Sequence, residues 1–154
     1  MDLILDKELV FRDLTVNSDK EALAFLANEL YEKGYVKKEY IGAIQAREEE
    51  YPTGLPSTIP IIAIPHANFD LVNKTTLAIA TLKNPINFNN MENKKELLPV
   101  QIIIMMAIGE PHGQVEMLQK IVNIIQDEPL RKEMMTANNN EKLLELLKKS
   151  IKDN

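Results

Sequence analysis

Apolar residues recur along the first third of the chain at helical spacing. Ser18 and Glu21 form a capping-box signature, in which the serine side chain can accept from the third amide of a helix. Gly34 supplies a left-handed stop. The apolar positions between them repeat every three or four residues: Ala22, Leu23, Leu26, Leu30 and Tyr31. We therefore predict a helix that starts after Ser18 and ends near Gly34.

A second helix is predicted from residue 37 to about residue 50. Tyr40, Ile41 and Ile44 would face inward, and Pro52 prevents much continuation. Arg47 then falls in the last turn of this helix, immediately before a loop rich in proline and glycine, YPTGLPST.

Short apolar and β-branched runs predict four strands, over residues 8–16, 59–64, 75–82 and 100–108, of which the last is the most apolar and the most central. The polar, asparagine-rich stretch 82–96 between the last two is predicted to be a surface excursion. Three helices should follow residue 112. The first has an apolar face of Val115, Leu118, Val122 and Ile125, the second opens at Pro129, and the third runs from about Asn140.

This succession of strands and helices predicts a layered α/β domain rather than a bundle or a sandwich. The chain has 154 residues, of which 45% are hydrophobic. That length is enough for one well-packed core and too short for two. We therefore expect a single domain over residues 1–154.

Composition then excludes several classes of function. The chain contains no cysteine, so disulfides, thiolate metal sites and a cysteine nucleophile are absent. The first residues do not read as a signal peptide, and the longest apolar run is far shorter than the roughly 20 residues of a membrane span. The net charge of −5 gives no basic footprint for nucleic acid. We expect a cytoplasmic protein with neither nucleic acid nor direct membrane insertion.

The two histidines of the chain occupy matching contexts. His66 follows an apolar run in IPH, and His112 follows another in EPH. Each comes directly after a proline, which fixes its own φ angle and so limits the positions that the histidine ring can take. In open α/β sheets, ligands and chemistry gather beyond the carboxyl ends of the strands. If the two strands are neighbours, the two imidazoles can meet.

A single histidine at a strand end is more often structural than catalytic, and two in matching contexts leave both interpretations open. Two histidines with only Asp70 nearby make an incomplete metal shell, so we expect no metal and no bound cofactor. No serine sits in a G-x-S-x-G turn, and no glycine-rich phosphate loop exists. What remains is a histidine that accepts a phosphoryl group, with the planar fork of Arg47 binding the phosphoryl oxygens. A solvated helix end, facing the acidic residues 48–50, is the alternative for Arg47.

The block AREEEYPTGLP (residues 46–56), followed by AIPH (residues 63–66), closely resembles the enzyme IIA domain of the fructose/mannitol superfamily of the bacterial phosphoenolpyruvate-dependent sugar phosphotransferase system. The arginine block looks most like the galactitol branch. The resemblance spans nearly the whole chain. It implies a mixed sheet of about five strands with helices on both faces, which agrees with the layered α/β domain expected above.

The resemblance also implies roles for residues. His66 matches the histidine that takes phosphate from the phosphorylated histidine-containing phosphocarrier protein and passes it to a cysteine of enzyme IIB, which serves the membrane IIC permease. Arg47 matches the arginine that holds the phosphoryl oxygens. His112 matches a second histidine of the mannitol branch, which assists transfer. Thr53 and Gly54 become candidates for positioning near the phosphate.

Two further interpretations stay open. The same domain could be a regulatory module that signals its phosphorylation state by binding, or His66 and His112 could serve a metal-dependent hydrolase. Docking of a protein partner should involve an exposed apolar patch around His66, for which Leu55 and Phe69 are the candidates. Burial in the core is the equal alternative for either residue. The transported sugar is not encoded in any of these motifs.

Overall fold

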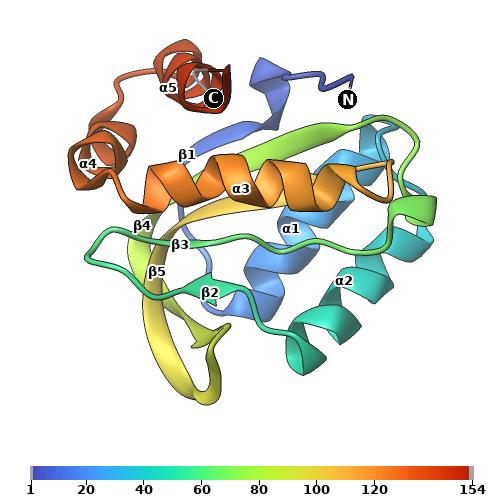
Figure 1. Cartoon of the computed structure of the whole chain (residues 1–154), viewed down its shortest axis with the longest axis horizontal. Helices are drawn as coiled ribbons and strands as arrows, with labels where there is room; N and C mark the ends of the chain where they lie inside the picture. Colours follow the sequence, from blue (N-terminus) through green and yellow to red (C-terminus); the bar gives the residue numbers. More distant parts are fainter. Residues whose placement is uncertain (1, 153–154) are drawn as a thin grey trace.

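The structure, a computed structural model, describes residues 2–152 and forms a mixed five-stranded sheet covered by helices on both faces (Figure 1). Its strands are β1 (Val10–Leu14), β2 (Gly54–Leu55), β3 (Ile61–Ala63), β4 (Thr76–Asn90) and β5 (Asn93–Ala107). Its helices are α1 (Asp19–Glu32), α2 (Glu39–Glu50), α3 (Gly113–Ile125), α4 (Glu128–Thr136) and α5 (Asn140–Lys152). None of these helices, within the described residues, is long and apolar enough to cross a membrane. The predicted α/β class is confirmed.

Alternation along the central strands divides the core into two layers. On β5, Ile103 and Met105 face α1 and α2, whereas Ile102 and Ile104 face α3, α4 and α5. Both sets are buried. A sheet buried on both faces explains why β5 reads as a continuous apolar run in the sequence.

The strands are joined so that the carboxyl ends of β3 and β5 meet at one edge. β3 pairs with β5 in parallel, and β4 pairs with β5 as a long antiparallel hairpin. The short β2 pairs with β3 on one side and with the far end of β4 on the other, so β4, β5, β3 and β2 close a ring. Gly54 sits where that ring closes, and a Cβ atom there would lie 2.7 Å from the carbonyl oxygen of Asn89. This close approach requires glycine.

The prediction of a surface excursion over residues 82–96 is wrong, because this stretch forms the end of β4 and the start of β5. β4 continues through it to Asn90, and β5 begins at Asn93 after a two-residue turn. Ile86 and Phe88 are buried at alternate positions among polar neighbours. This alternation is typical of a strand with one face exposed to solvent. The many asparagines make the alternation hard to recognise in the sequence.

Helix α3 buries a different face from the predicted one. Its buried positions are Gly113, Met117, Ile121 and Ile124, whereas Val115 is 60% exposed and Val122 is 40% exposed. Apolar residues cover more than half of its circumference, so periodicity alone cannot choose the inner face. Val115 and Val122 remain as an apolar stripe on the surface.

A fully buried arginine ties the entry of β3 to the far end of α3. Arg131, on α4, donates from Nε to the carbonyl oxygen of Pro60 (2.9 Å) and from Nη2 to the carbonyl and the hydroxyl of Thr58 (3.0 and 2.7 Å). Its Nη1 donates to the carbonyls of Ile124 (3.0 Å) and Ile125. These bonds fix the chain just before the strand that leads to His66.

Candidate functional site

His66 lies three residues beyond the end of β3 and still pairs with β5. It forms a parallel bridge with Met106, and the amide of Met106 donates to the carbonyl of Pro65 (2.9 Å). The Met106 carbonyl in turn accepts from the hydroxyl of the buried Tyr40 (2.7 Å). The backbone of His66 is therefore held by the central strand, and that strand is bonded to α2.

The ring of His66 is oriented by a single backbone acceptor. Its Nδ1 lies 2.9 Å from the carbonyl oxygen of Ile64. Because a carbonyl can only accept, Nδ1 must carry the proton, and in the neutral ring the lone pair is then on Nε2. Burial lowers the pKa of His66, the bond to Ile64 raises it in part, and the charge of Arg47 lowers it again. Both observations favour the neutral ring, with its lone pair on Nε2 and its orientation fixed by the Ile64 carbonyl.

Arg47 lies in the last turn of α2, as predicted, on the face of the helix that carries Tyr40 and Ile44 at the spacing i, i+4, i+7. Its side chain is half-buried, and its guanidinium carbon lies 5.4 Å from the centre of the Tyr51 ring. Its Nε is buried and has no hydrogen-bond partner among residues 2–152. A buried donor without an acceptor is rare and is expected where a ligand supplies one.

His112 is exposed and precedes the first turn of α3. β3 and β5 are neighbours, which was the condition for the two histidines to meet. The side chain of Gln114 donates to the carbonyl of Ala67 (2.8 Å), so the start of α3 is bonded to the residue after His66. No hydrogen bond joins the two histidine rings within the described part of the chain. The two segments come together, and a direct contact between the rings stays a prediction.

Glu48 is the residue at this site whose importance sequence reasoning missed. Its carboxylate accepts from the amide of Thr53 (2.8 Å) and from the hydroxyl of Thr53 (2.7 Å). The side chain is 8% exposed. Burial raises the pKa of Glu48 to about 7, against the lowering effect of the two bonds from Thr53 and of Arg47. The signal was present, because Glu48 follows the buried Ile44 by one helical turn and thus shares its inner face.

The two candidate docking residues differ in their exposure to solvent. Phe69 is 40% exposed, as a docking residue must be. Leu55 is 8% exposed and packs between the sheet and α3, so its assignment as a docking residue was wrong. Thr53 and Gly54 are both buried: Thr53 lies in the segment between α2 and β2, and Gly54 is the first residue of β2. No three acidic or histidine side chains among residues 2–152 are grouped as metal ligands would be.

Comparison with known proteins decides the family. Residues 3–150 match the family model of the phosphoenolpyruvate-dependent sugar phosphotransferase system, EIIA 2. The chain belongs to this family. In curated relatives of the EIIA 2 family, it is 30% identical over 133 residues to the transcriptional regulator ManR of Bacillus subtilis, covering 86% of this chain and 19% of that protein. It is 25% identical over 116 residues to the galactitol-specific EIIA component of Escherichia coli K12, covering 75% of this chain and 77% of that one.

Among solved structures, this EIIA 2 chain is similar to the complex of enzyme IIAMTL and phosphorylated enzyme IIBMTL from Escherichia coli. The TM-score is 0.76 at 26% identity, with 95% of this chain and 98% of that chain covered. The mannitol and galactitol proteins thus match about equally well, and the galactitol branch is not singled out. The chain spans about a fifth of the length of ManR.

The buried carboxyl of Glu48 predicts a pH-dependent stability. Its pKa rises from 4.5 in the unfolded chain to about 7 in the folded one, so the folded state binds the proton more tightly. The free energy of unfolding should therefore fall by about 3 kcal/mol as the pH rises from about 4.5 to above 7. Glu48→Gln, which stays neutral, should lack this decline and be the more stable protein at about pH 8, as measured by urea unfolding.

Glu50→Gln is the matched control, because Glu50 is an exposed carboxyl on the same helix end and should leave the decline in place. If the gap between Glu48→Gln and the unmodified protein does not change with pH, the carboxyl does not titrate as inferred.

Proposed function

We propose that this protein is a phosphoryl carrier of the sugar phosphotransferase system and that His66 carries the phosphoryl group. The observation that supports it most directly is the bond from Nδ1 of His66 to the Ile64 carbonyl, which leaves Nε2 as the nucleophile, while the charge of the half-buried Arg47 acts on the pKa of the same ring. Membership of the EIIA 2 family supports the same chemistry.

The reaction consists of two in-line transfers of one phosphoryl group. Nε2 of His66 forms a bond to phosphorus while the bond from phosphorus to the histidine of the phosphocarrier protein breaks, and that imidazole leaves with its nitrogen lone pair. A cysteine thiolate of enzyme IIB then attacks phosphorus, and the bond to Nε2 breaks. The complex of enzyme IIAMTL with phosphorylated enzyme IIBMTL, to which this chain is similar, supports a IIB partner and through it a IIC permease. This chain would work in the cytoplasm.

Arg47 and His112 act on the phosphoryl oxygens in this proposal. The unpartnered Nε of Arg47 would donate to one oxygen, and its positive charge would balance charge in the transition state. His112 and the positive end of the α3 dipole would approach from the side of β5.

A second candidate, a regulatory module, is favoured by one observation. Of the relatives described above, the one with the highest sequence identity, 30%, is a transcriptional regulator. In that case phosphate on His66 would change the affinity for a binding partner and would not pass to a cysteine. Transfer of label from His66 to a IIB cysteine distinguishes the two. A metal-dependent hydrolase, the third possibility, requires loss of activity on addition of a chelator, to which the phosphoryl carrier is indifferent.

His66→Ala should abolish phosphorylation, and His112→Ala should slow transfer without preventing it. The protein would be incubated with phosphoenolpyruvate, enzyme I and the phosphocarrier protein, and acid-labile phosphate would be mapped by mass spectrometry. Label at full stoichiometry on the His66→Ala protein would contradict the assignment. The fold of both variants is checked by their thermal unfolding, which should change little because neither ring fills the core.

Arg47→Lys should slow transfer by about 100-fold, because the ammonium keeps the charge but cannot place a fork of donors on the phosphoryl oxygens. The rate is measured by rapid quench with phosphorylated carrier protein. Arg12→Lys is the control, since Arg12 lies on β1 and donates to Ala137 and Asn140, away from His66. A loss no greater than that of the control would argue that Arg47 is only a helix-end charge.

Val115→Glu should weaken docking of a protein partner. Val115 lies next to Gln114, whose side chain is bonded to Ala67, so the exposed stripe of α3 starts beside the active ring. A charge buried in an apolar contact is costly, and the KM for the phosphocarrier protein should rise about tenfold with little change in kcat. Leu97→Glu changes an equally exposed apolar residue on the β4–β5 hairpin and serves as control. Equal KM values for the two variants would place the docking surface elsewhere.

A further inference from the structure

A series of hydrogen bonds connects a carboxyl on α2 to the nitrogen of the His66 ring. Glu48 accepts from the amide and the hydroxyl of Thr53. The carbonyl of Thr53 accepts from the amide of Ile64 (3.1 Å), and the carbonyl of Ile64 accepts from Nδ1 of His66. Ile64 is thus held by its amide on the side of Thr53 and holds the ring with its carbonyl. The orientation of the imidazole ring therefore depends, through Ile64, on the position of the Thr53 backbone.

We propose that Glu48 is a positioning residue for phosphoryl transfer, and that its ionised carboxylate holds Thr53, Ile64 and the His66 ring in the reactive arrangement. This inference rests on the proposed function. Glu48 does not contact the reacting atoms. It acts through the turn after α2, and since Arg47 is its neighbour in that last turn, the same bonds fix the backbone from which the guanidinium extends.

The ionised form is the one that matches the contacts. Both carboxyl oxygens face donors, an N–H and an O–H of Thr53, and hydrogen bonds to a charged acceptor are roughly twice as strong as those between neutral groups. Protonation places a hydrogen on one of these oxygens and removes the negative charge, so each bond from Thr53 then has a neutral acceptor. The contact between Glu48 and Thr53, called the clamp below, then consists of two hydrogen bonds between neutral groups and holds the turn less firmly.

Glu48 is 8% exposed and lies at the wall of a cleft. Glu48 lines a cleft of about 280 Å³ at the junction of α1, α2 and the β4–β5 hairpin. The charged groups that face it are Asp19 and Lys20 of α1, Arg47 and Glu49 of α2, and Lys94 of β5. Burial, and to a smaller extent the charge of Asp19, raise the pKa of Glu48 to about 7, so the contact with Thr53 should respond to pH around neutrality.

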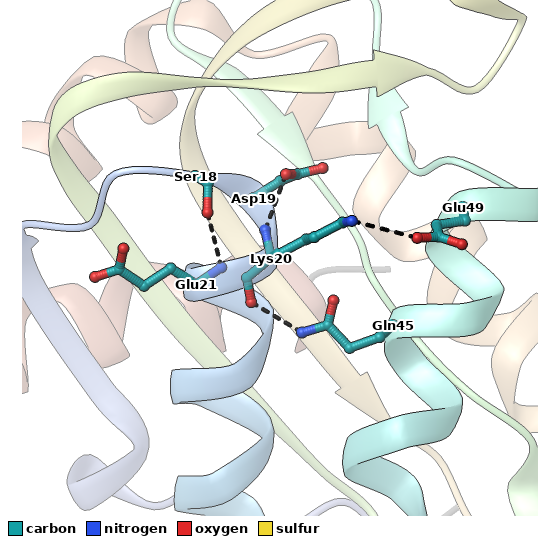
Figure 2. A network of polar contacts seen from close by, with 6 residues as sticks. All are labelled: Ser18, Asp19, Lys20, Glu21, Gln45 and Glu49. Atoms are coloured by element: carbon teal, nitrogen blue, oxygen red, sulfur yellow. Dashed lines mark hydrogen bonds and ion pairs between the residues drawn. The ribbon is translucent and has the colours of Figure 1, made fainter.

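The wall of this cleft is itself fixed. Figure 2 shows Gln45 of α2 donating to the carbonyl of Lys20 on α1 (2.8 Å), and the ammonium of Lys20 lying 3.5 Å from Glu49. Ser18 caps the same end of α1 by accepting from the amide of Glu21. These contacts link α1 and α2 on the same side of the molecule as Glu48.

The test compares the unmodified chain with Glu48→Gln in transfer from the phosphorylated carrier protein, from about pH 5.5 to about pH 8.5. The kcat of the unmodified protein should rise with pH through about 7. Glu48→Gln should show no such rise and should be about tenfold slower at about pH 8, with KM unchanged, although it is the more stable protein there. A variant that follows the unmodified profile, or that loses the same factor at every pH, would overturn the proposal.

Glu50→Gln provides the matched control and should keep the unmodified profile, since its carboxyl is exposed on the same turn. A second measurement needs no phosphoryl donor. The NMR signals of the His66 ring and of the Ile64 amide should titrate with an inflection near pH 7 that Glu48→Gln lacks. His66 that takes up phosphate without this inflection contradicts the clamp. The inflection in a protein that takes up no phosphate supports the coupling and overturns the phosphoryl role.

Discussion

The parallel pairing of β3 with β5 is the constraint on which the rest of the site depends. A strand of three residues has little pairing energy of its own, and β3 is held because its Ile62 and Ile61 are buried on opposite faces of the sheet against the two helical layers. Parallel pairing places both carboxyl ends at one edge. His66 and the start of α3 are neighbours for that reason, and α2 reaches the same edge because Tyr40 is bonded to β5.

The candidate site holds three ionisable groups, and hydrogen bonds to neighbouring residues hold two of them. His66 is oriented by a carbonyl, and Glu48 is held by an amide and a hydroxyl, whereas the Nε of Arg47 has no acceptor within residues 2–152. Removing carboxylates from water costs stability unless they are well paired. A buried carboxyl that raises the cost of folding at neutral pH is therefore expected where the arrangement serves another purpose than stability.

The sequence predicted the fold well where a pattern had one physical meaning. The cap at Ser18, the stop at Gly34 and the end of α2 before Pro52 are local signals, and the structure contains each of them, with Glu21 accepting from the amide of Asn17 rather than from that of Ser18. The β4–β5 hairpin was missed because its alternation is diluted by asparagine. The inner face of α3 was assigned wrongly because two apolar stripes compete, and only packing selects one.

The candidate site was predicted in its residues and not in its connections. Arg47, His66 and His112 were assigned from motif context, and the first two lie where their motifs placed them, at the end of α2 and beyond the end of β3. The bond from Nδ1 to Ile64 and the bond from Thr53 to Ile64 depend on a turn that no local pattern specifies. Glu48 was read as one of three acidic residues, because charge in a sequence does not show which member of a run is turned inward.

Arg131 gives the two histidine segments a common support far from either ring. It binds the chain before β3 and also the last carbonyls of α3, the helix that begins beside His112. A helix of 13 residues is roughly 20 Å long, so a tilt of about 3° at that support moves the other end by about 1 Å. Displacements of this size are enough to disturb an in-line transfer. In the proposed transfer, the rigidity of the junction between α3 and α4 would therefore matter as much as the side chains that contact phosphorus.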